Sequence, residues 1–140
     1  EAEWERTAAG ASGRQYPWTE RNPDLLPGPT VLNYNNNVGD TTQVGSYPLG
    51  RSSAGTFDQA GNVAEWVADW YAEDYGGLTG EDGGPVINPQ GPSEEEGRVV
   101  RDSTFIHEVV GTFLRGNNFS GDPEFSLPMY GFRCAYDPEE

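Results

Sequence analysis

Glycine and proline recur along the whole chain and limit the length of every regular element it can form. The 140 residues include 19 Gly and 11 Pro, spread from one end to the other. Glycine weakens helices and strands by its conformational freedom, and proline removes a backbone donor, so both interrupt regular structure. The sequence therefore predicts brief strands connected by turns and long loops.

The chain is nevertheless long enough and aromatic enough to fold. A length of 140 residues suits one domain with a single core. The apolar fraction of 34% leaves out the glycines, and 4 Trp, 7 Tyr and 6 Phe supply large areas for burial. No apolar run approaches the roughly 20 residues that cross a bilayer, so we expect no direct membrane insertion of this segment.

The charge balance restricts the partners. With 8 basic and 23 acidic residues the formal net charge is −15. Such a surplus repels phosphate backbones and anionic membranes, so nucleic acid is excluded as an expected partner. The same surplus suits cations. A solvated acidic surface explains it equally well.

Four segments carry the signals of regular structure. Residues 1–9 are rich in helix formers and stop at Gly10, and the absence of capping residues before them predicts a missing preceding segment. Residues 98–105, 112–119 and 130–136 are typical of short strands. Residues 57–71 fit a helix face or a strand, and periodicity leaves that choice open.

Between the helix and the strands lies a loop region that needs an explanation. Residues 10–56 are dominated by Gly, Pro, Asn, Asp and Ser. Long loops in compact domains are usually functional or held by other ties, such as metal ions. Two compact oxygen-donor pairs occur with glycines beside them, Asn33 with Asp40 and Asp58 with Glu65. They favour calcium, although solvated loop acids remain the simpler alternative.

The nucleophilic and soft-metal signals are weak. His107 is the only histidine and Cys134 the only cysteine, so a usual zinc or copper site cannot be completed. We expect a structural histidine and a buried structural thiol. Ser103 and Thr104 lie near His107, but no motif such as GxSxG frames them as a nucleophile and base.

Five ordered segments together resemble the sulfatase-modifying-factor family, the formylglycine-generating enzymes and their relatives. They are EAEWE at 1–5, YPW at 16–18, GDTTQVGSYP at 39–48, DQAGNVAEW at 58–66 and GFRCA at 131–135. The resemblance implies an α+β fold, a variant of the C-type-lectin fold that is rich in loops and has short antiparallel strands. It also implies that residues 1–140 are the C-terminal portion of one such domain, whose N-terminal half is missing.

The resemblance also assigns two structural calcium sites. The first would use the Asn33 and Asp40 side chains with the Tyr34 and Thr42 carbonyls. The second would use the Asp58 and Glu65 side chains with the carbonyls of Gly61 and Val63. The side-chain donors are the same two pairs that oxygen-ligand chemistry selects.

The catalytic part of the family pattern is absent. The family's enzymes bind copper(I) through two cysteines, but here the first position falls on His107 and the second on Thr112 or, after a one-residue shift, Phe113. Copper is therefore not expected. Ala64 replaces the first tryptophan of the usual WEW, and Asp102 and Ser103 replace glycines, so the substrate groove is altered.

These features lead to a ranked set of functions. The first is a non-catalytic, calcium-stabilised binding or scaffold module with a protein partner in a larger extracytoplasmic assembly. The second is an oxygen-dependent formylglycine-generating or related sulfur-oxidising enzyme whose catalytic groups come from elsewhere. The third is a lectin-like surface protein that binds carbohydrate or protein through residues 102–119, with Asn117, Asn118 and Phe119 as contacts. The expected location is the periplasm or cell surface.

Overall fold

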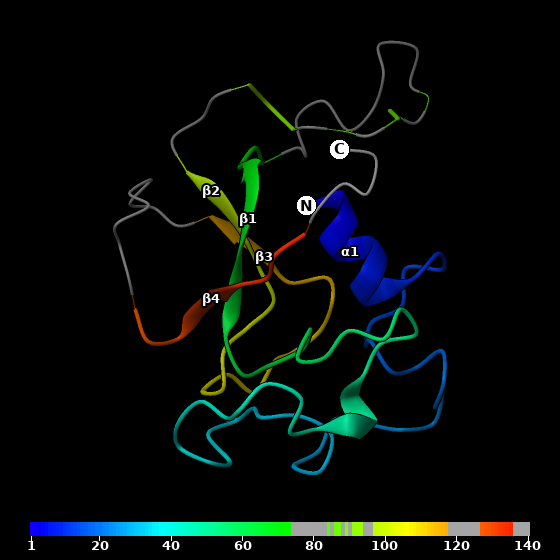
Figure 1. Cartoon of the computed structure of the whole chain (residues 1–140), viewed down its shortest axis with the longest axis vertical. Helices are drawn as coiled ribbons and strands as arrows, with labels where there is room; N and C mark the ends of the chain where they lie inside the picture. Colours follow the sequence, from blue (N-terminus) through cyan, green and yellow to red (C-terminus); the bar gives the residue numbers. More distant parts are fainter. Residues whose placement is uncertain are drawn as a thin grey trace.

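The structure is a computed structural model that describes residues 1–73, 84, 86, 87, 89, 91–93, 97–117 and 127–135. The elements in these ranges are α1 (Ala2–Ala9), the 3-10 turn η1 (Pro48–Gly50), β1 (Ala64–Trp70), β2 (Arg98–Arg101), β3 (Arg115–Asn117) and β4 (Tyr130–Phe132). In Figure 1 the strands and α1 lie beside each other, and the loops of residues 11–63 lie mainly below them in the view. The fold is mixed α+β and rich in loops, as the sequence predicts.

The α1 helix packs through one face. Trp4, Ala8 and Ala9 are buried, and their spacing places them on one side of the helix. The helix ends at Gly10, which has φ 68° and donates its amide to the Arg6 carbonyl at 3.1 Å. Glycine adopts this left-handed conformation at little cost, so the predicted helix end is confirmed.

The four strands form one sheet in the order β3-β2-β1-β4. β2 pairs antiparallel with β1 and with β3, as expected, but β4 runs parallel to β1. The prediction of antiparallel strands is therefore wrong for this pair. Parallel neighbours need a long crossover connection, and the chain between β1 and β4 supplies one. Residues 64–70 settle the open choice as a strand, with partners on both sides.

The predicted strands are longer than the observed ones. β2 stops at Arg101 because Asp102 has φ 62°, which breaks the extended conformation. β3 begins only at Arg115, after a turn. Phe119 and Tyr136, the predicted strand ends, lie outside the described residues, as does most of the acidic stretch 72–97.

The loop region has an apolar core of its own. Trp18 is completely buried, stacks on Tyr16 with ring centroids 5.1 Å apart, and donates its indole N–H to the Leu25 carbonyl at 2.7 Å. The buried residues packed around it are Val31, Leu32, Ala60 and Val110. Loops that carry this much buried surface are held by side-chain packing rather than by strand pairing.

Two further observations complete the fold. The thiol of Cys134 lies exposed on the segment after β4, so the prediction of a buried structural thiol is wrong. GFRCA continues past the end of β4, where no described element covers the thiol. Within the described ranges, no helix has the length and hydrophobicity to cross a bilayer.

Candidate functional site

The first predicted donor loop is closed by side-chain amides. Asn33 is buried, and its Nδ2 donates to the Asp40 carbonyl at 2.9 Å and to the Asn62 Oδ1 at 3.2 Å. Asn62 also accepts from the Thr42 amide at 2.9 Å and donates to the Thr42 carbonyl at 3.2 Å. Asn33, Asp40 and Thr42 are therefore gathered around the side chain of Asn62.

One oxygen in this cluster has no hydrogen bond. The Oδ1 of Asn33 is buried and accepts from no group in the described part of the chain. A buried acceptor without a partner costs about 1–3 kcal/mol, so native structures rarely leave one. The Asp40 carboxylate is exposed, and within the described ranges it accepts only from the adjacent Thr41. Both side chains thus keep oxygen lone pairs for a further partner.

The second predicted donor set is more occupied. Glu65 is buried and accepts the Trp4 indole N–H at 2.5 Å and the Arg133 Nε–H at 2.7 Å. Arg133 also forms an ion pair with the other Glu65 oxygen. Asp58, with φ 54°, accepts the Gly45 amide at 2.7 Å. Glu65 therefore has a cationic partner before any metal is considered.

Asp58 and Glu65 lie close enough to affect each other. Burial is the main cause that raises the pKa of Asp58, and the negative charge of Glu65 adds to it. Hydrogen bonding from Gly45 and the charge of Arg133 oppose the rise. Asp58 thus lies in a buried environment together with Glu65 and Arg133, and its use as a calcium ligand stays a prediction.

Gly61 joins the donor loops by close backbone contact. A Cβ on Gly61 would come within 2.3 Å of the Asn33 carbonyl oxygen, and the residue has φ 77°. The next amide, that of Asn62, donates to the same carbonyl at 2.8 Å. Only glycine fits here, which explains physically why the GN pair occurs in this motif.

Asp102 links two loops of the site, a role that the sequence reasoning did not assign to it. It takes the left-handed conformation, which Asp tolerates better than most residues, at a position where the family resemblance implies glycine. Its carboxylate accepts the Gly61 amide at 2.5 Å and the Gly111 amide at 3.5 Å. Burial raises the pKa of Asp102 well above its ordinary value, although these amides oppose the rise. The sequence does not reveal that Asp102 has a positive φ.

The positions implied for the copper cysteines hold an imidazole and a hydroxyl. His107 is exposed, and its Nδ1 accepts the Thr104 amide at 3.2 Å and lies 3.0 Å from the Thr104 Oγ1. Thr112 is buried, and its hydroxyl donates to the Arg14 carbonyl. Phe113, the alternative second position, is 52% exposed. The structural role of His107 stays a prediction.

The same loop is tied to the first donor loop through its backbone. The Asn35 amide donates to the His107 carbonyl at 2.8 Å, and the Asn36 amide donates to the Phe105 carbonyl at 2.7 Å. The Phe105 amide in turn donates to the Asn62 carbonyl at 2.9 Å. The donor loops and residues 104–107 therefore form one hydrogen-bonded unit.

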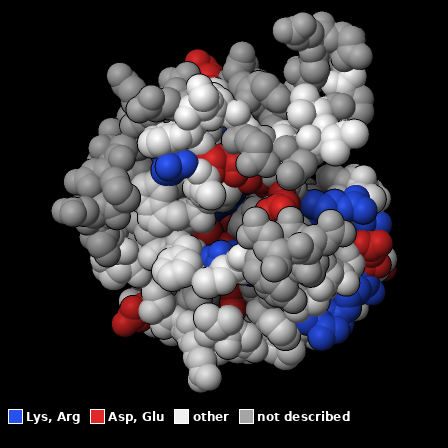
Figure 2. All heavy atoms as spheres, turned by 45° about the horizontal axis from the view of Figure 1, so that its top comes forward, with Lys and Arg blue, Asp and Glu red and all other residues white. Residues whose placement is uncertain are grey.

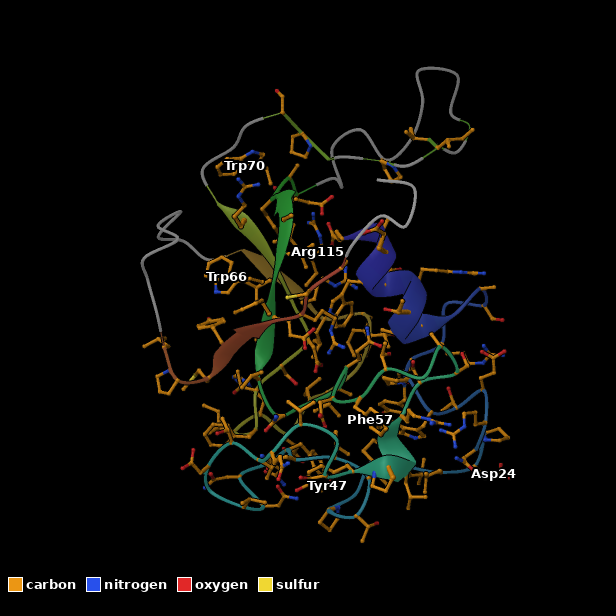
Figure 3. The ribbon with its side chains drawn as sticks, in the orientation of Figure 1. Asp24, Tyr47, Phe57, Trp66, Trp70 and Arg115 are labelled. Atoms are coloured by element: carbon orange, nitrogen blue, oxygen red, sulfur yellow. The ribbon has the colours of Figure 1, made fainter. Side chains whose placement is uncertain are left out.

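Two arginines, Arg101 and Arg115, form hydrogen bonds to Glu1 next to this unit. Arg101 is completely buried and donates to Glu1 Oε1 and to the Thr112 carbonyl, each at 2.6 Å. Arg115, labelled in Figure 3, donates from its Nε to the same Glu1 oxygen at 2.6 Å. Burial alone would raise the pKa of Glu1, but hydrogen bonds and charge from Arg115 and Arg101 hold it below its ordinary value.

The described surface mixes charges of both signs. Figure 2 shows red acidic side chains beside blue basic ones around a central hollow, so the coloured residues of that face make no patch of one sign. Among the described residues, no group of three or more His, Cys, Asp and Glu is arranged to hold a metal ion. A cation site built from the described residues would therefore use amide and carbonyl oxygens as well.

A family model described as "Sulfatase-modifying factor enzyme 1-like domain" matches residues 1–138. The chain belongs to this family. The formylglycine-generating enzyme of Streptomyces coelicolor is 32% identical over 99% of the chain and 46% of its own length. A serine/threonine-protein kinase Pkn1 of Chlamydia trachomatis is 35% identical over 98% of the chain and 20% of its own length. The chain thus spans less than half of each of these relatives.

Two solved structures share the fold of the chain. PvdO from Pseudomonas aeruginosa superposes with a TM-score of 0.68 at 22% identity, over 94% of the chain and 48% of that structure. Treponema denticola variable protein 1 superposes with a TM-score of 0.60 at 26% identity, over 94% and 44%. The family resemblance of the five ordered sequence segments is confirmed.

Proposed function

We propose that this family domain is a non-catalytic, calcium-stabilised module that binds a protein partner in a larger extracytoplasmic assembly. The observation that carries the proposal is the chemistry at His107 and Thr112, where the family resemblance requires two thiolates. An imidazole and a hydroxyl are harder donors than thiolates and do not suit copper(I). The copper site therefore does not fit these residues.

The environment of Thr112 supports a structural use of that position. Its hydroxyl donates to the Arg14 carbonyl and its amide donates to the Gln15 carbonyl at 3.0 Å. Arg101 donates to the Thr112 carbonyl. Each polar group of Thr112 thus has a partner in the fold, which leaves the residue no part in redox chemistry.

The donor chemistry supports calcium more strongly at the first proposed site. The unpartnered Asn33 Oδ1 and the exposed Asp40 carboxylate are oxygen donors of the kind that calcium prefers. Residues Asn33, Tyr34, Asp40 and Thr42 would hold the ion. At the second site Arg133 already neutralises Glu65, so Asp58, Gly61, Val63 and Glu65 fit a cation only if that ion pair opens.

A calcium ion at the first site would also stabilise the surface we propose for binding. The hydrogen bonds from Asn35 and Asn36 lead from the donor loop to residues 104–107. This neighbourhood exposes apolar side chains, with Ile106 44%, Val109 60% and Phe113 52% exposed. Clustered exposed apolar residues are typical of protein interaction surfaces. This distribution supports a protein partner over carbohydrate. Of the contacts expected for carbohydrate, Asn117 ends β3, and Asn118 and Phe119 lie outside the described residues.

The lectin-like variant of the fold and the location belong to the same proposal. A small sheet with a loop-rich end that carries calcium is the arrangement that the resemblance implies for this C-type-lectin variant. Calcium modules of low affinity work at the high free calcium found outside cells. The periplasm or cell surface is therefore the location that suits a calcium-stabilised module.

The catalytic alternative has a direct test. The whole protein is incubated with copper(I), oxygen and a peptide that carries a CxPxR sequence, and the peptide is examined by mass spectrometry. We expect no conversion of its cysteine to formylglycine. An aldehyde product that needs both copper and oxygen would refute the non-catalytic proposal, and the formylglycine-generating enzyme of Streptomyces coelicolor serves as the positive control.

The calcium proposal is tested by stability. Calcium at about 100 times its Kd should stabilise the fold by about 2.7 kcal/mol, measured as a rise in Tm over the chelated protein. Asp40→Ala should remove most of this rise, because it deletes a proposed ligand. Asp24→Ala, which changes another exposed loop aspartate, is the matched control and should keep it. No bound metal on elemental analysis and an unchanged Tm would contradict the proposal.

A further inference from the structure

The basic residues of this acidic chain fall into two groups. All 8 of them are arginines, set against 23 acids. Four lie in or next to the sheet and donate to backbone or carboxylate groups of the fold, and they are Arg98, Arg101, Arg115 and Arg133. The other four lie on α1 and in the loops that follow it. Half of the cations are thus concentrated at one end of the sequence.

Three of these arginines, Arg14, Arg21 and Arg51, meet in the loop region and are called the arginine cluster below. The Nη1 of Arg21 donates to the Arg51 carbonyl at 3.2 Å. Arg14 reaches the same place, because a Cβ built on Gly10 would lie 3.2 Å from its Nη1 and 3.8 Å from the Ser53 Oγ. Two stretches of loop that are distant in sequence therefore bring their cations together.

The fold leaves most of the charge of this cluster without a counter-charge. Arg21 and Arg51 are exposed, and in the described part of the chain neither forms an ion pair. Arg14 pairs with Glu20 at 3.1 Å, with side chains 29% and 45% exposed. Such an exposed pair is worth only about 0–1 kcal/mol, so a partner can replace it. Gathered charges of one sign repel each other, and an anionic partner relieves that repulsion.

The arginines of the cluster are partly held in place before a partner arrives. The Cζ of Arg51 lies 5.9 Å from the ring centroid of Phe57, which is labelled in Figure 3. Arg21 is held by its bond to the Arg51 carbonyl. A guanidinium that is already positioned loses less rotamer freedom on binding. Its planar donor fork matches a carboxylate with two parallel hydrogen bonds.

The charge of the whole chain restricts the size of the anion. The formal net charge is −15, and the exposed acids Glu20 and Asp24 lie beside the cluster in sequence. A nucleic acid or an anionic membrane extends past the cluster and is repelled by the acids around it. At physiological salt the Debye length is about 8 Å, so a short segment senses mainly the arginines it covers. A short acidic peptide segment fits these conditions best.

From these features we infer that the arginine cluster binds an acidic segment of a protein partner through its Asp or Glu carboxylates. The inference rests on the proposed function, because it names the chemistry of the protein partner proposed there. The cluster also adjoins the loop that carries the exposed Phe113. The Thr112 hydroxyl donates to the Arg14 carbonyl, and the Thr112 amide donates to the Gln15 carbonyl at 3.0 Å.

The test titrates hexaglutamate into the whole protein labelled with ¹⁵N, and amide shifts are followed by NMR. The amides of Arg14, Arg21 and Arg51 should shift at low salt, and the affinity should fall at physiological salt. Hexaglutamine is the neutral control and should not bind. No binding of hexaglutamate, or shifts that leave these amides unchanged, would overturn the inference.

Two further anions test the other classes of partner. Hexathymidylate and vesicles of phosphatidylserine are titrated in the same way. Both should bind more weakly than hexaglutamate, because the acidic surroundings of the cluster repel them. Equal or tighter binding of either one at the cluster would overturn the assignment to a peptide.

Three glutamine variants separate the cluster from net charge. Arg21→Gln and Arg51→Gln should each weaken hexaglutamate binding about threefold, within the range that one exposed ion pair supplies. Arg6→Gln is the matched control, because Arg6 is exposed on α1 and lines a different hollow with Ala68 and Asp69. It should leave the affinity unchanged. Equal weakening in all three variants would show that only net charge matters.

A variant of the opposite sign sharpens the test. Glu20→Gln removes the carboxylate that pairs with Arg14, so hexaglutamate should bind about threefold more tightly. Glu3→Gln, which changes an exposed acid on α1, is its control and should change nothing. A lower affinity in Glu20→Gln, or an equal gain in both variants, would contradict the inference.

A second copy of this chain is the remaining occupant. Diffusion measured by NMR without peptide should not slow as the protein concentration rises. A slowing that Arg21→Gln abolishes would assign the cluster to self-association and overturn the inference. The aldehyde and calcium measurements use none of these arginines, so failure of peptide binding leaves them intact. An aldehyde product with hexaglutamate binding would refute the non-catalytic proposal and keep this surface.

Discussion

The donor loops, 33–42 and 58–65, and the neighbouring loop 102–112 use polar residues in different ways. The donor loops direct side-chain amides inward, as the Asn33 and Asn62 contacts show. In loop 102–112 the buried polar atoms bond mainly to backbone, and the exposed side chains include Ile106 and Val109. The first region is organised to hold its own chain together, whereas the second is held in place and presents a surface.

A family assignment implies both a fold and a reaction, and the difference between these two regions separates the two. The packing that positions the loops survives in the chain, because it depends on backbone contacts such as that of Gly61 with Asn33. The chemistry of the second region depends on side chains alone, and there the thiolates are absent. Under the proposed function, the family fold persists without the family reaction.

The largest expected effect comes from removing the support beneath loop 102–112. Arg101→Met removes one of the two arginines that pair with Glu1 in a buried site, and breaking a buried ion pair costs about 3–5 kcal/mol. Chemical denaturation measures the loss. Arg14→Met, which breaks an exposed pair with Glu20, should cost under about 1 kcal/mol. Similar losses in both variants would show that burial does not distinguish the two pairs.

The donor loops should be most sensitive at their closest contact. Gly61→Ala forces a Cβ against the Asn33 carbonyl and strains a positive φ, so we expect a loss of about 2–4 kcal/mol. Gly55→Ala is the matched control, since it has φ 91° but open space around the added Cβ, and should lose about 1 kcal/mol. Equal losses would mean that backbone strain alone explains the effect.

Removal of the Thr112 hydroxyl tests the structural use of the second copper position. Thr112→Val keeps the shape of the side chain but loses its bond to the Arg14 carbonyl, for about 1 kcal/mol of stability. Thermal unfolding measures the change against Thr41→Val, an exposed threonine. A stabilised Thr112→Val variant would show that the hydroxyl is not needed for packing.

The smallest effect is on pH dependence, because it comes from one carboxylate. The pKa of Glu1 is held below its ordinary value of 4.5, so the folded state binds this proton less tightly than the unfolded state. Its contribution is complete above about pH 4.5 and is lost as pH falls through the lowered pKa. Arg101→Met should flatten that part of the stability curve. An unchanged slope below pH 4.5 would exclude Glu1 as its source.

Much of the fold follows from local sequence. The helix and its end at Gly10 follow from residue propensities, and the strands near 98, 115 and 130 follow from β-branched and aromatic residues. The two donor pairs follow from residue type. The lengths and directions of the strands do not follow from local sequence. β2 ends where Asp102 adopts a positive φ, and β4 pairs parallel to β1, a strand distant in sequence.

The sequence by itself determined that this chain is a loop-rich member of its family and that it lacks the two thiolates, because composition and motif order are local properties. Only the tertiary structure decided which groups meet. Asn62 joins the donor loops, and Asp102 ties Gly61 to Gly111. These contacts join residues far apart along the chain, and buried hydrogen bonds and packing select them only after the loops close.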